Sequence, residues 1–240
     1  MESGHSVLYE RSHMLLAVET SGTQGSVAIS NGSNVLAERI LQTGGHRHAQ
    51  SLVSEVDLLL KEQNLRPADI RSVAVSIGPG SFTGLRVGLV FAKTFAWLNQ
   101  TQLVAVDTLR AIAQQAGNEH LKVTAVIDAQ RGEVFAGTYC RDASSGYQQL
   151  QGRIGVAAAE VLPTDHPLTG PGLDRIKSVL DARYQLLEAP LWQPRASTVA
   201  SLGYEMVLRQ EFSTPESLEP VYIRLSYAEE KRDQAVPKLV

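Results

Sequence analysis

The amino-acid sequence predicts an α/β protein made of two related halves. Short apolar runs of strand length alternate with longer segments whose apolar residues recur every three or four positions, which is the pattern of strands and amphipathic helices. Turns that contain glycine, asparagine or proline separate these segments. The pattern also repeats, because the strand ends Ala17–Glu19 and Val126–Asp128 lie 109 residues apart in similar surroundings. We therefore expect two α/β halves that meet near residues 117–121.

The composition is that of a globular protein. The 240 residues are 43% hydrophobic and 20% charged, which suits one large or two smaller domains. The net charge of −3 argues against a protein that grips nucleic acid by itself, because such proteins usually carry a basic excess. Cys140 is the one cysteine, so an internal disulfide is excluded and we expect a structural thiol.

The two ends of the chain are expected to be loose extensions. No run reaches the roughly 18 uninterrupted apolar residues of a membrane span, and residues 1–13 lack the apolar core of a signal peptide. We therefore expect a cytoplasmic protein with no membrane partner. Residues 1–13 and 229–240 are expected to be flexible, and the two halves to span residues 14–117 and 118–228.

The first half is predicted to hold five strands and three helices. Asn31-Gly32 is a strong signal for a two-residue hairpin turn. Asn64 and Pro67 end the first helix, and Asp107 or Thr108 caps the third. The predicted strands are Met14–Val18, Ser26–Ser30, Asn34–Leu41, Ser72–Ile77 and Gln102–Val106, and the helices are Ala49–Gln63, Thr83–Asn99 and the segment from Thr108 to Ala116.

The second half is predicted to begin like the first, with three extended segments. Shorter elements follow, and Ser197 is the expected cap of the last helix. The predicted extended segments are Lys122–Ile127, Glu133–Cys140, Tyr147–Ile154, Tyr184–Leu187 and Val221–Leu225. The predicted helices are Ala157–Leu162, which is a short helix or turn, Leu173–Leu180 and Ser197–Gln210.

The turn after the first strand, Glu19-Thr20-Ser21-Gly22, is a candidate phosphate loop. An acidic residue at a strand end, followed by Thr, Ser and Gly, resembles the phosphate loop of the actin, sugar-kinase and heat-shock-ATPase superfamily. In that superfamily the acid organises a metal–phosphate complex, while hydroxyl and backbone N–H groups meet the nucleotide. The alternative is a turn whose hydroxyl groups satisfy the local backbone.

Other polar residues give weaker signals. His46 and His48 are two residues apart, whereas histidines that share a metal on a helix are usually four apart, so an exposed loop is preferred. Asp128 and Glu133 are a carboxylate pair, but they are equally suited to orient Arg131 in a hairpin, and no catalysis is assigned to them. The glycine-rich stretch Gly78–Gly88 contains no P-loop lysine.

A stripe of small residues runs along the helix that follows this stretch. Gly84, Gly88, Ala92 and Ala96 recur every four residues. Two glycines in a helix cost about 1 kcal/mol each relative to alanine, which is tolerable where another backbone must approach closely. That backbone belongs either to a partner protein or to the sheet of the same chain. We expect the partner.

Five segments together resemble the TsaB (YeaZ) family of bacterial tRNA threonylcarbamoyladenosine biosynthesis proteins. Gly78–Arg86 (GPGSFTGLR) is similar to the family signature, and the matches run in order from residue 14 to about 228. The opening strand ends in Glu19 where the family commonly has Asp. The other similar segments are His48-Ala49-Gln50, Asp128–Phe135 (DAQRGEVF), which has one extra residue, and Pro220–Arg224 (PVYIR).

The resemblance implies two actin-like (ribonuclease H-like) halves and a non-catalytic subunit with no cofactor of its own. It implies pairing with a TsaD-like catalytic subunit, a TsaE-like ATPase in the larger complex, self-pairing as a homodimer when alone, and contact with tRNA only through the complex. ATP and a metal are expected in the partner subunits. The expected interface lies on the two helices of the first half, at Leu52, Val56, Leu59, Gly80, Ser81, Phe82, Thr83, Gly84, Arg86, Val87, Gly88, Phe91, Ala92 and Phe95.

Two other functions are weighed against this one. The first is an active nucleotide-dependent or metal-dependent enzyme of the same fold, either a phosphotransferase or a metallopeptidase-like protein, which the Glu19 turn and Asp128 motivate. The second is a stand-alone tRNA binder, which the acidic balance of the chain disfavours.

Overall fold

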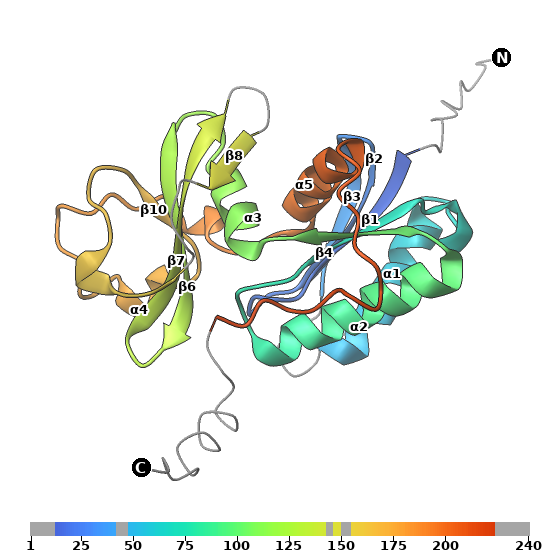
Figure 1. Ribbon diagram of the computed structural model, residues 1–240, viewed down its shortest axis with the longest axis horizontal. Helices are drawn as coiled ribbons and strands as arrows, with labels where there is room; N and C mark the ends of the chain where they lie inside the picture. Colours follow the sequence, from blue (N-terminus) through green and yellow to red (C-terminus); the bar gives the residue numbers. More distant parts are fainter. Residues whose placement is uncertain (1–12, 42–47, 143–145, 150–154, 224–240) are drawn as a thin grey trace, which may run out of the picture.

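The computed structural model describes residues 13–41, 48–142, 146–149 and 155–223. Two sheets lie side by side, each with its own helices, and the protein has the predicted α/β fold with two actin-like halves (Figure 1). None of the helices within these ranges has the length and hydropathy needed to cross a membrane.

The first sheet has the strand order β3-β2-β1-β4-β5. Two antiparallel hairpins join β1, β2 and β3, and β4 and β5 extend the sheet in parallel beside β1. The strands are β1 (Met14–Glu19), β2 (Ser26–Asn31), β3 (Asn34–Ile40), β4 (Ser72–Ser76) and β5 (Gln102–Val106). All five therefore form close to where the apolar runs and the Asn31-Gly32 turn predict them.

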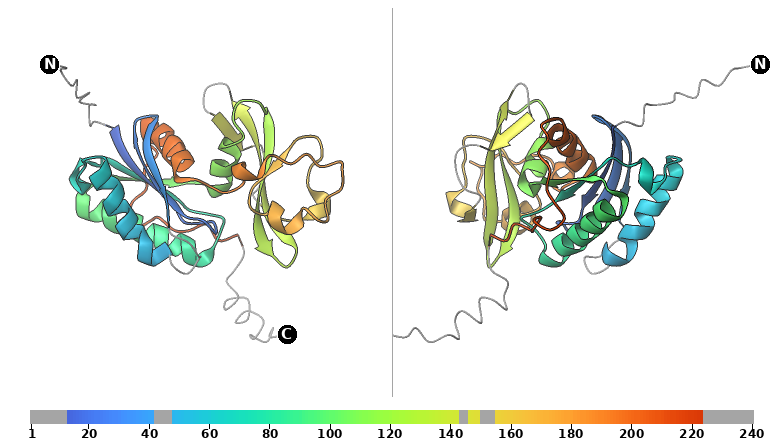
Figure 2. Two further views of the ribbon diagram at one scale, coloured as in Figure 1. Left: turned by 180° about the vertical axis from the view of Figure 1, so that it is seen from behind. Right: turned by 45° about the vertical axis from the view of Figure 1, so that its right-hand side comes forward.

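Helices cover both faces of this sheet (Figures 1 and 2). Side chains alternate between the two faces of a strand, so Leu16 and Val18 of β1 pack under α1 (His48–Glu62) and α2 (Phe82–Asn99). Leu15 and Ala17 face α5 (Ala196–Leu208) on the other side. A short 3₁₀ turn, η2 (Pro67–Asp69), precedes β4.

The second sheet repeats the beginning of the first. Its order is β10-β6-β7-β8, with β9 also paired to β7. β6 and β7 are antiparallel and β10 lies parallel to β6, which matches β1, β2 and β4. The elements are β6 (Lys122–Gln130), β7 (Glu133–Asp142), β8 (Gly146–Gln149), β9 (Gly155–Ala158), η3 (Ala159–Val161), β10 (Leu168–Thr169), α4 (Leu173–Ile176) and η4 (Ala189–Leu191). α3 (Thr108–Gln114) lies between the sheets (Figure 1).

The last part of the chain returns to the first half, which corrects the expected division at residues 118–228. Helix α5 packs against β1 and β4, Ser213 pairs with Leu103 of β5, and the Val221 N–H donates to Ile77 O at 2.8 Å. The pattern of residues within this segment does not reveal which sheet it covers, because both sheets need an apolar partner.

Three smaller predictions also differ. Helix α5 starts at Ala196, so Ser197 lies inside its first turn and does not cap it; the Ser197 N–H donates to Glu38 Oε1 at 3.1 Å. The helix predicted over Leu173–Leu180 ends at Ile176. The strand predicted over Tyr184–Leu187 is reduced to a single bridge between Leu186 and Leu168. The predicted extensions, His46 and residues 150–154 lie outside the described residues, apart from His13.

Candidate functional site

Two turns interlock at one edge of the first sheet. The acidic turn, Glu19–Gly22, follows β1, and the glycine turn, residues 78–81, follows β4. Because β1 and β4 are parallel neighbours, their carboxyl ends meet at the same edge. The Ser81 N–H donates to Ser21 O at 2.8 Å, and Thr20 Oγ1 donates to Gly84 O at 2.8 Å. The two sequence-predicted sites thus form a single structure.

Glu19 is fully buried beneath these turns. Its Oε1 accepts hydrogen bonds from the N–H and the hydroxyl of Ser21, each at 2.5 Å. Within the described residues, Glu19 Oε2 and the hydroxyl of Ser76 have no hydrogen-bond partner. Burial raises the pKa of the Glu19 carboxyl, and the hydrogen bonds from Ser21 oppose that shift in part. The structure therefore favours the neutral acid more than an exposed position would.

The groups that would bind a phosphate are already used inside the protein. The hydroxyls of Thr20 and Ser21 and the Ser21 N–H all bind protein oxygens. Pro194 packs against Gly22, since a Cβ atom placed on that glycine would lie 3.3 Å from Pro194 Cγ. The candidate residues are therefore brought together, but the hydroxyl groups of Thr20 and Ser21 are already bonded within the protein in the turn as folded.

The other acid–base candidates have local roles. Asp128 Oδ1 accepts from the Gln130 N–H at 2.7 Å in the β6–β7 turn, and Asp128 Oδ2 lies 3.4 Å from Arg175 Nε. His48 begins α1. Within the part of the chain that the structure describes, no group of three or more His, Cys, Asp or Glu residues is arranged to hold a metal ion.

The small stripe of α2 packs inside the chain, so the expectation that it faces a partner is wrong. Ser81 caps the helix, its hydroxyl accepting from the Gly84 N–H at 3.2 Å. A Cβ atom on Gly84 would lie 1.9 Å from Thr20 O, and one on Gly88 would lie 2.3 Å from Thr20 Oγ1. The glycines admit the backbone of the acidic turn. Ala92 and Ala96 are buried along the same face.

Most other residues of the expected interface are also turned inward. A Cβ atom on Gly80 would lie 2.6 Å from Ser21 O, and Ser81, Thr83 and Arg86 are the exposed members of the set. The members in the core between α1, α2 and the sheet are Leu52, Val56, Leu59, Ala92 and Phe95, with Val87 and Phe91 packed at its margin. Phe82 is half-buried. The five core members are at most 9% exposed, so they offer a partner little surface while the chain stays folded.

The apolar residues that do face outward from these helices were missed in the sequence. We name them the outer face: Val53, Leu58, Val90, Trp97 and Leu98. Val90, Trp97 and Leu98 are 63%, 70% and 66% exposed. At about 100° per residue, Val90 and Trp97 lie on one line of α2. Their seven-residue spacing could have predicted an exposed apolar line on α2. The stripe of small residues that was singled out instead lies on the opposite side of the helix.

A polar relay in the second half was also missed, because its residues are far apart in sequence. Asp165 Oδ1 lies 2.8 Å from His166 Nδ1, His166 Nε2 lies 2.8 Å from Thr124 Oγ1, and Thr124 Oγ1 lies 2.7 Å from Thr138 Oγ1. Burial lowers the pKa of His166. The order resembles an acid–base–nucleophile relay, but Thr124 is only 1% exposed. The relay therefore acts as an internal hydrogen-bond chain.

A second buried network joins the two halves. Asp107 caps α3, as the sequence predicts, through its Oδ1 and the Arg110 N–H at 2.6 Å, and the same oxygen accepts from the Tyr139 hydroxyl at 2.9 Å. Burial raises the pKa of both Asp107 and Tyr139. Arg110 donates from Nε to Tyr147 O at 2.9 Å and contacts Glu205 of α5 at 3.3 Å.

Comparison with known proteins gives one consistent result. The family model "TsaD: tRNA N6-adenosine threonylcarbamoyltransferase" matches residues 33–226. The tRNA threonylcarbamoyladenosine biosynthesis protein TsaB of Bacillus subtilis (strain 168) is 30% identical over 227 residues, which are 90% of this chain and 96% of that protein. TsaB of Escherichia coli (strain K12) is 27% identical over 226 residues, covering 90% and 97% of the two chains.

A solved structure agrees with these relatives. YeaZ from Pseudomonas aeruginosa superposes with a TM-score of 0.77 at 28% identity, over 88% of this chain and 99% of that chain. The likeness therefore extends over most of both chains. The chain belongs to the TsaB (YeaZ) family of tRNA threonylcarbamoyladenosine biosynthesis proteins.

Proposed function

We propose that this chain is a non-catalytic subunit of the complex that makes N6-threonylcarbamoyladenosine in tRNA. In this proposal it pairs with a TsaD-like subunit in the cytoplasm. The TsaD-like subunit transfers threonylcarbamoyl from threonylcarbamoyl-adenylate to the adenosine beside the anticodon of tRNAs that read codons starting with A. ATP and a metal act in the partner subunits, which include a TsaE-like ATPase, and tRNA is reached only through the complex.

The observation that carries the pairing is the outer face of α1 and α2. Val90, Trp97 and Leu98 are each more than 60% exposed, and α1 and α2 lie side by side on the outside of the first sheet (Figure 2). Large apolar side chains that are exposed on neighbouring helices are of the kind that protein interfaces bury. In the absence of the catalytic subunit, a second copy of the chain covers the same face.

The closed acidic turn supports a non-catalytic role. The Thr20 hydroxyl anchors α2, the Ser21 hydroxyl bonds Glu19, and Pro194 packs against Gly22. Glu19 and Thr20 have no exposed surface. A turn that packs against α2 and bonds to it has a structural role in the first half, which favours a subunit over an enzyme of nucleotide chemistry.

The experiment is co-expression with a TsaD homologue, followed by size-exclusion chromatography and a threonylcarbamoyl-transfer assay with each subunit omitted. Val53→Glu is expected to abolish co-elution, because a buried unpaired charge costs about 2–5 kcal/mol at an interface and Val53 lies outside the cation-lined flank of α2. Val179→Glu is the matched control, since Val179 in the second half is 63% exposed and Val53 is 64% exposed. Wild-type co-elution and transfer by Val53→Glu would exclude the outer face as the pairing surface.

The alternative, an active enzyme of the same fold, rests on the Glu19 carboxyl, whose Oε2 has no hydrogen-bond partner within the described residues. A bound cation or a phosphate-bearing ligand that reached it would require the acidic turn to open. Calorimetry of the isolated chain with ATP–Mg²⁺ and with Zn²⁺ separates the two functions. Tight binding of either would favour the enzyme, and heat of dilution alone would favour the subunit.

A further inference from the structure

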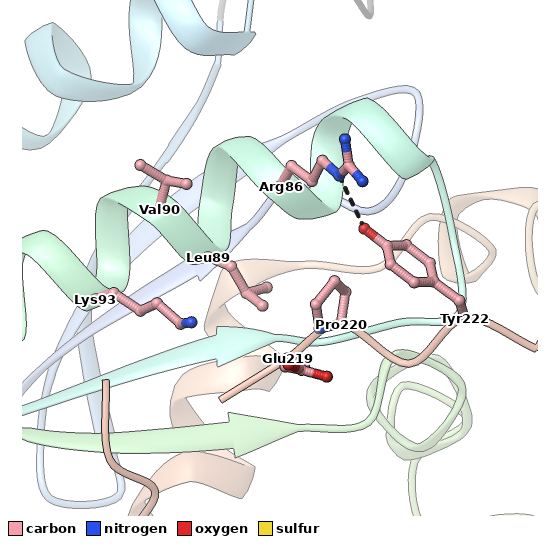
Figure 3. Close-up of a pocket in the computed structure, with 7 residues that line it drawn as sticks. All are labelled: Arg86, Leu89, Val90, Lys93, Glu219, Pro220 and Tyr222. Atoms are coloured by element: carbon pink, nitrogen blue, oxygen red, sulfur yellow. Dashed lines mark hydrogen bonds between the residues drawn. The ribbon is translucent and has the colours of Figure 1, made fainter. Parts of the chain in front are cut away.

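A pocket lies on the flank of α2, between this helix and the segment from Glu219 to Tyr222 (Figure 3). Its volume is about 340 Å³, which is enough for one or two side chains. Leu89 and Pro220 supply apolar surface, while Arg86 and Lys93 bring two positive charges from the helix. No residue of the interlocked turns takes part in this pocket.

The far wall of the pocket is firmly attached to the first half. Leu218, just before it, is buried in the core between α1, α2 and the sheet. Within it, the Val221 N–H donates to Ile77 O at 2.8 Å, and the Tyr222 ring packs on Phe82 with centroids 4.8 Å apart. The pocket is therefore formed before any ligand binds, which lowers the entropic cost of binding.

Arg86 and Tyr222 are oriented together at one end of the pocket, and Lys93 lies at the other (Figure 3). Arg86 Nε donates to the Tyr222 hydroxyl oxygen at 3.1 Å, and its guanidinium carbon lies 3.8 Å from the centroid of the Phe82 ring. Because the Tyr222 oxygen accepts this bond, its own hydrogen remains to be donated. Among the described residues, neither Arg86 nor Lys93 has a carboxylate partner.

These donors match an anion that has an apolar neighbour. The terminal nitrogens of Arg86 and the Tyr222 hydroxyl suit a carboxylate, which an arginine fork binds in a planar, two-point manner. Lys93 follows Arg86 by seven residues, about 10 Å further along the same flank of the helix. Val90 lines the pocket and also belongs to the outer face, so a partner that covers the outer face reaches the pocket.

We propose that this pocket binds an acidic side chain, with the aliphatic residue beside it, from the protein partner that docks on the outer face. The inference rests on the proposed function, because it states which residue types the partner carries at the margin of its docking surface. A nucleic-acid backbone is disfavoured, since phosphate tracking uses a row of cations and this chain carries a net charge of −3. Glu219 in the opposite wall adds a negative charge, which opposes an extended polyanion along the whole pocket more than one carboxylate held at the Arg86 and Tyr222 end (Figure 3).

The test measures the dissociation constant of the complex with the TsaD homologue at low and high salt. Arg86→Gln is expected to weaken binding about ten- to a hundredfold, and Tyr222→Phe about two- to tenfold. Arg183→Gln, an exposed arginine of the second half paired with Asp181, is the control and should leave the affinity unchanged. Thermal unfolding of each variant alone confirms that the exposed substitutions leave the fold intact.

The outcomes separate the two proposals. If Val53→Glu abolishes pairing while Arg86→Gln pairs like the wild type at both salt concentrations, the pocket proposal is wrong and the proposed function stands. If the wild-type chain does not pair with the homologue, both are wrong. If partner affinity is unchanged but Arg86→Gln weakens binding of tRNA to the assembled complex, the occupant is a nucleic-acid phosphate and the acidic segment is excluded.

Discussion

Replacing Gly84 with alanine should destabilise the isolated chain rather than act on a partner. A Cβ atom at this position would lie 1.9 Å from Thr20 O and 3.1 Å from the Thr20 carbonyl carbon. These are backbone atoms of the acidic turn, which Ser81 and Gly84 also hold by hydrogen bonds. Relief of the clash therefore requires α2 to move away from β1, and the turn to loosen.

The magnitude follows from three terms. Overpacking in a closely packed region costs about 1–3 kcal/mol, and loss of the Thr20–Gly84 hydrogen bond about 0.5–1.5 kcal/mol. Alanine recovers about 1 kcal/mol through its higher helix propensity. The free energy of unfolding should fall by about 0.5–3.5 kcal/mol in total.

Urea unfolding followed by circular dichroism measures this change, at two protein concentrations so that self-pairing is recognised. Thr83→Ala is the control, because Thr83 is an exposed residue of the same helix and surface changes usually stay within about 0.5 kcal/mol. If Gly84→Ala is as stable as Thr83→Ala but fails to pair, the glycine stripe faces the partner after all.

Three further predictions concern buried polar groups. Burial raises the pKa of Glu19, so the free energy of unfolding should fall as pH rises above about 4.3. Glu19→Gln should lose this dependence. If urea unfolding shows the same difference in stability between wild type and Glu19→Gln at pH 5 and at pH 8, the prediction is wrong. Burial lowers the pKa of His166, so stability should fall below about pH 6.5, and a persistent slope in His166→Gln would assign the effect elsewhere. Tyr139→Phe removes the hydroxyl that donates to Asp107 and should cost about 1 kcal/mol; urea unfolding that matched the wild type would show that the bond contributes nothing.

The elements of the first half follow from local signals. Asn31-Gly32 supports the hairpin between β2 and β3, and Asp107 caps α3, because turn and cap chemistry involves only neighbouring residues. The repeat of Ala17–Glu19 at Val126–Asp128 also predicted the second sheet. Helix α5 was assigned to the wrong sheet because a helix with an apolar face fits either one.

In the candidate site, too, local features could be predicted from the sequence and long-range contacts could not. The sequence identified the acidic turn and the glycine stripe as unusual, and the chemistry of each was interpreted separately. Contact between Thr20 and Gly84 bridges 64 residues, and only the parallel pairing of β1 and β4 brings them together. The relay of Thr124 and His166 spans 42 residues and left no local pattern.

The sequence by itself determined the fold class, the family resemblance and the fact that a backbone must approach Gly84 and Gly88 closely. That requirement follows from the absence of side chains at regular helical spacing, which is a local property of the chain. The tertiary structure decided which backbone approaches, because the answer depends on strand order and on the side of α2 that faces the sheet. It turned the glycines inward toward Thr20 and left Val90 and Trp97 exposed on the opposite side of the helix.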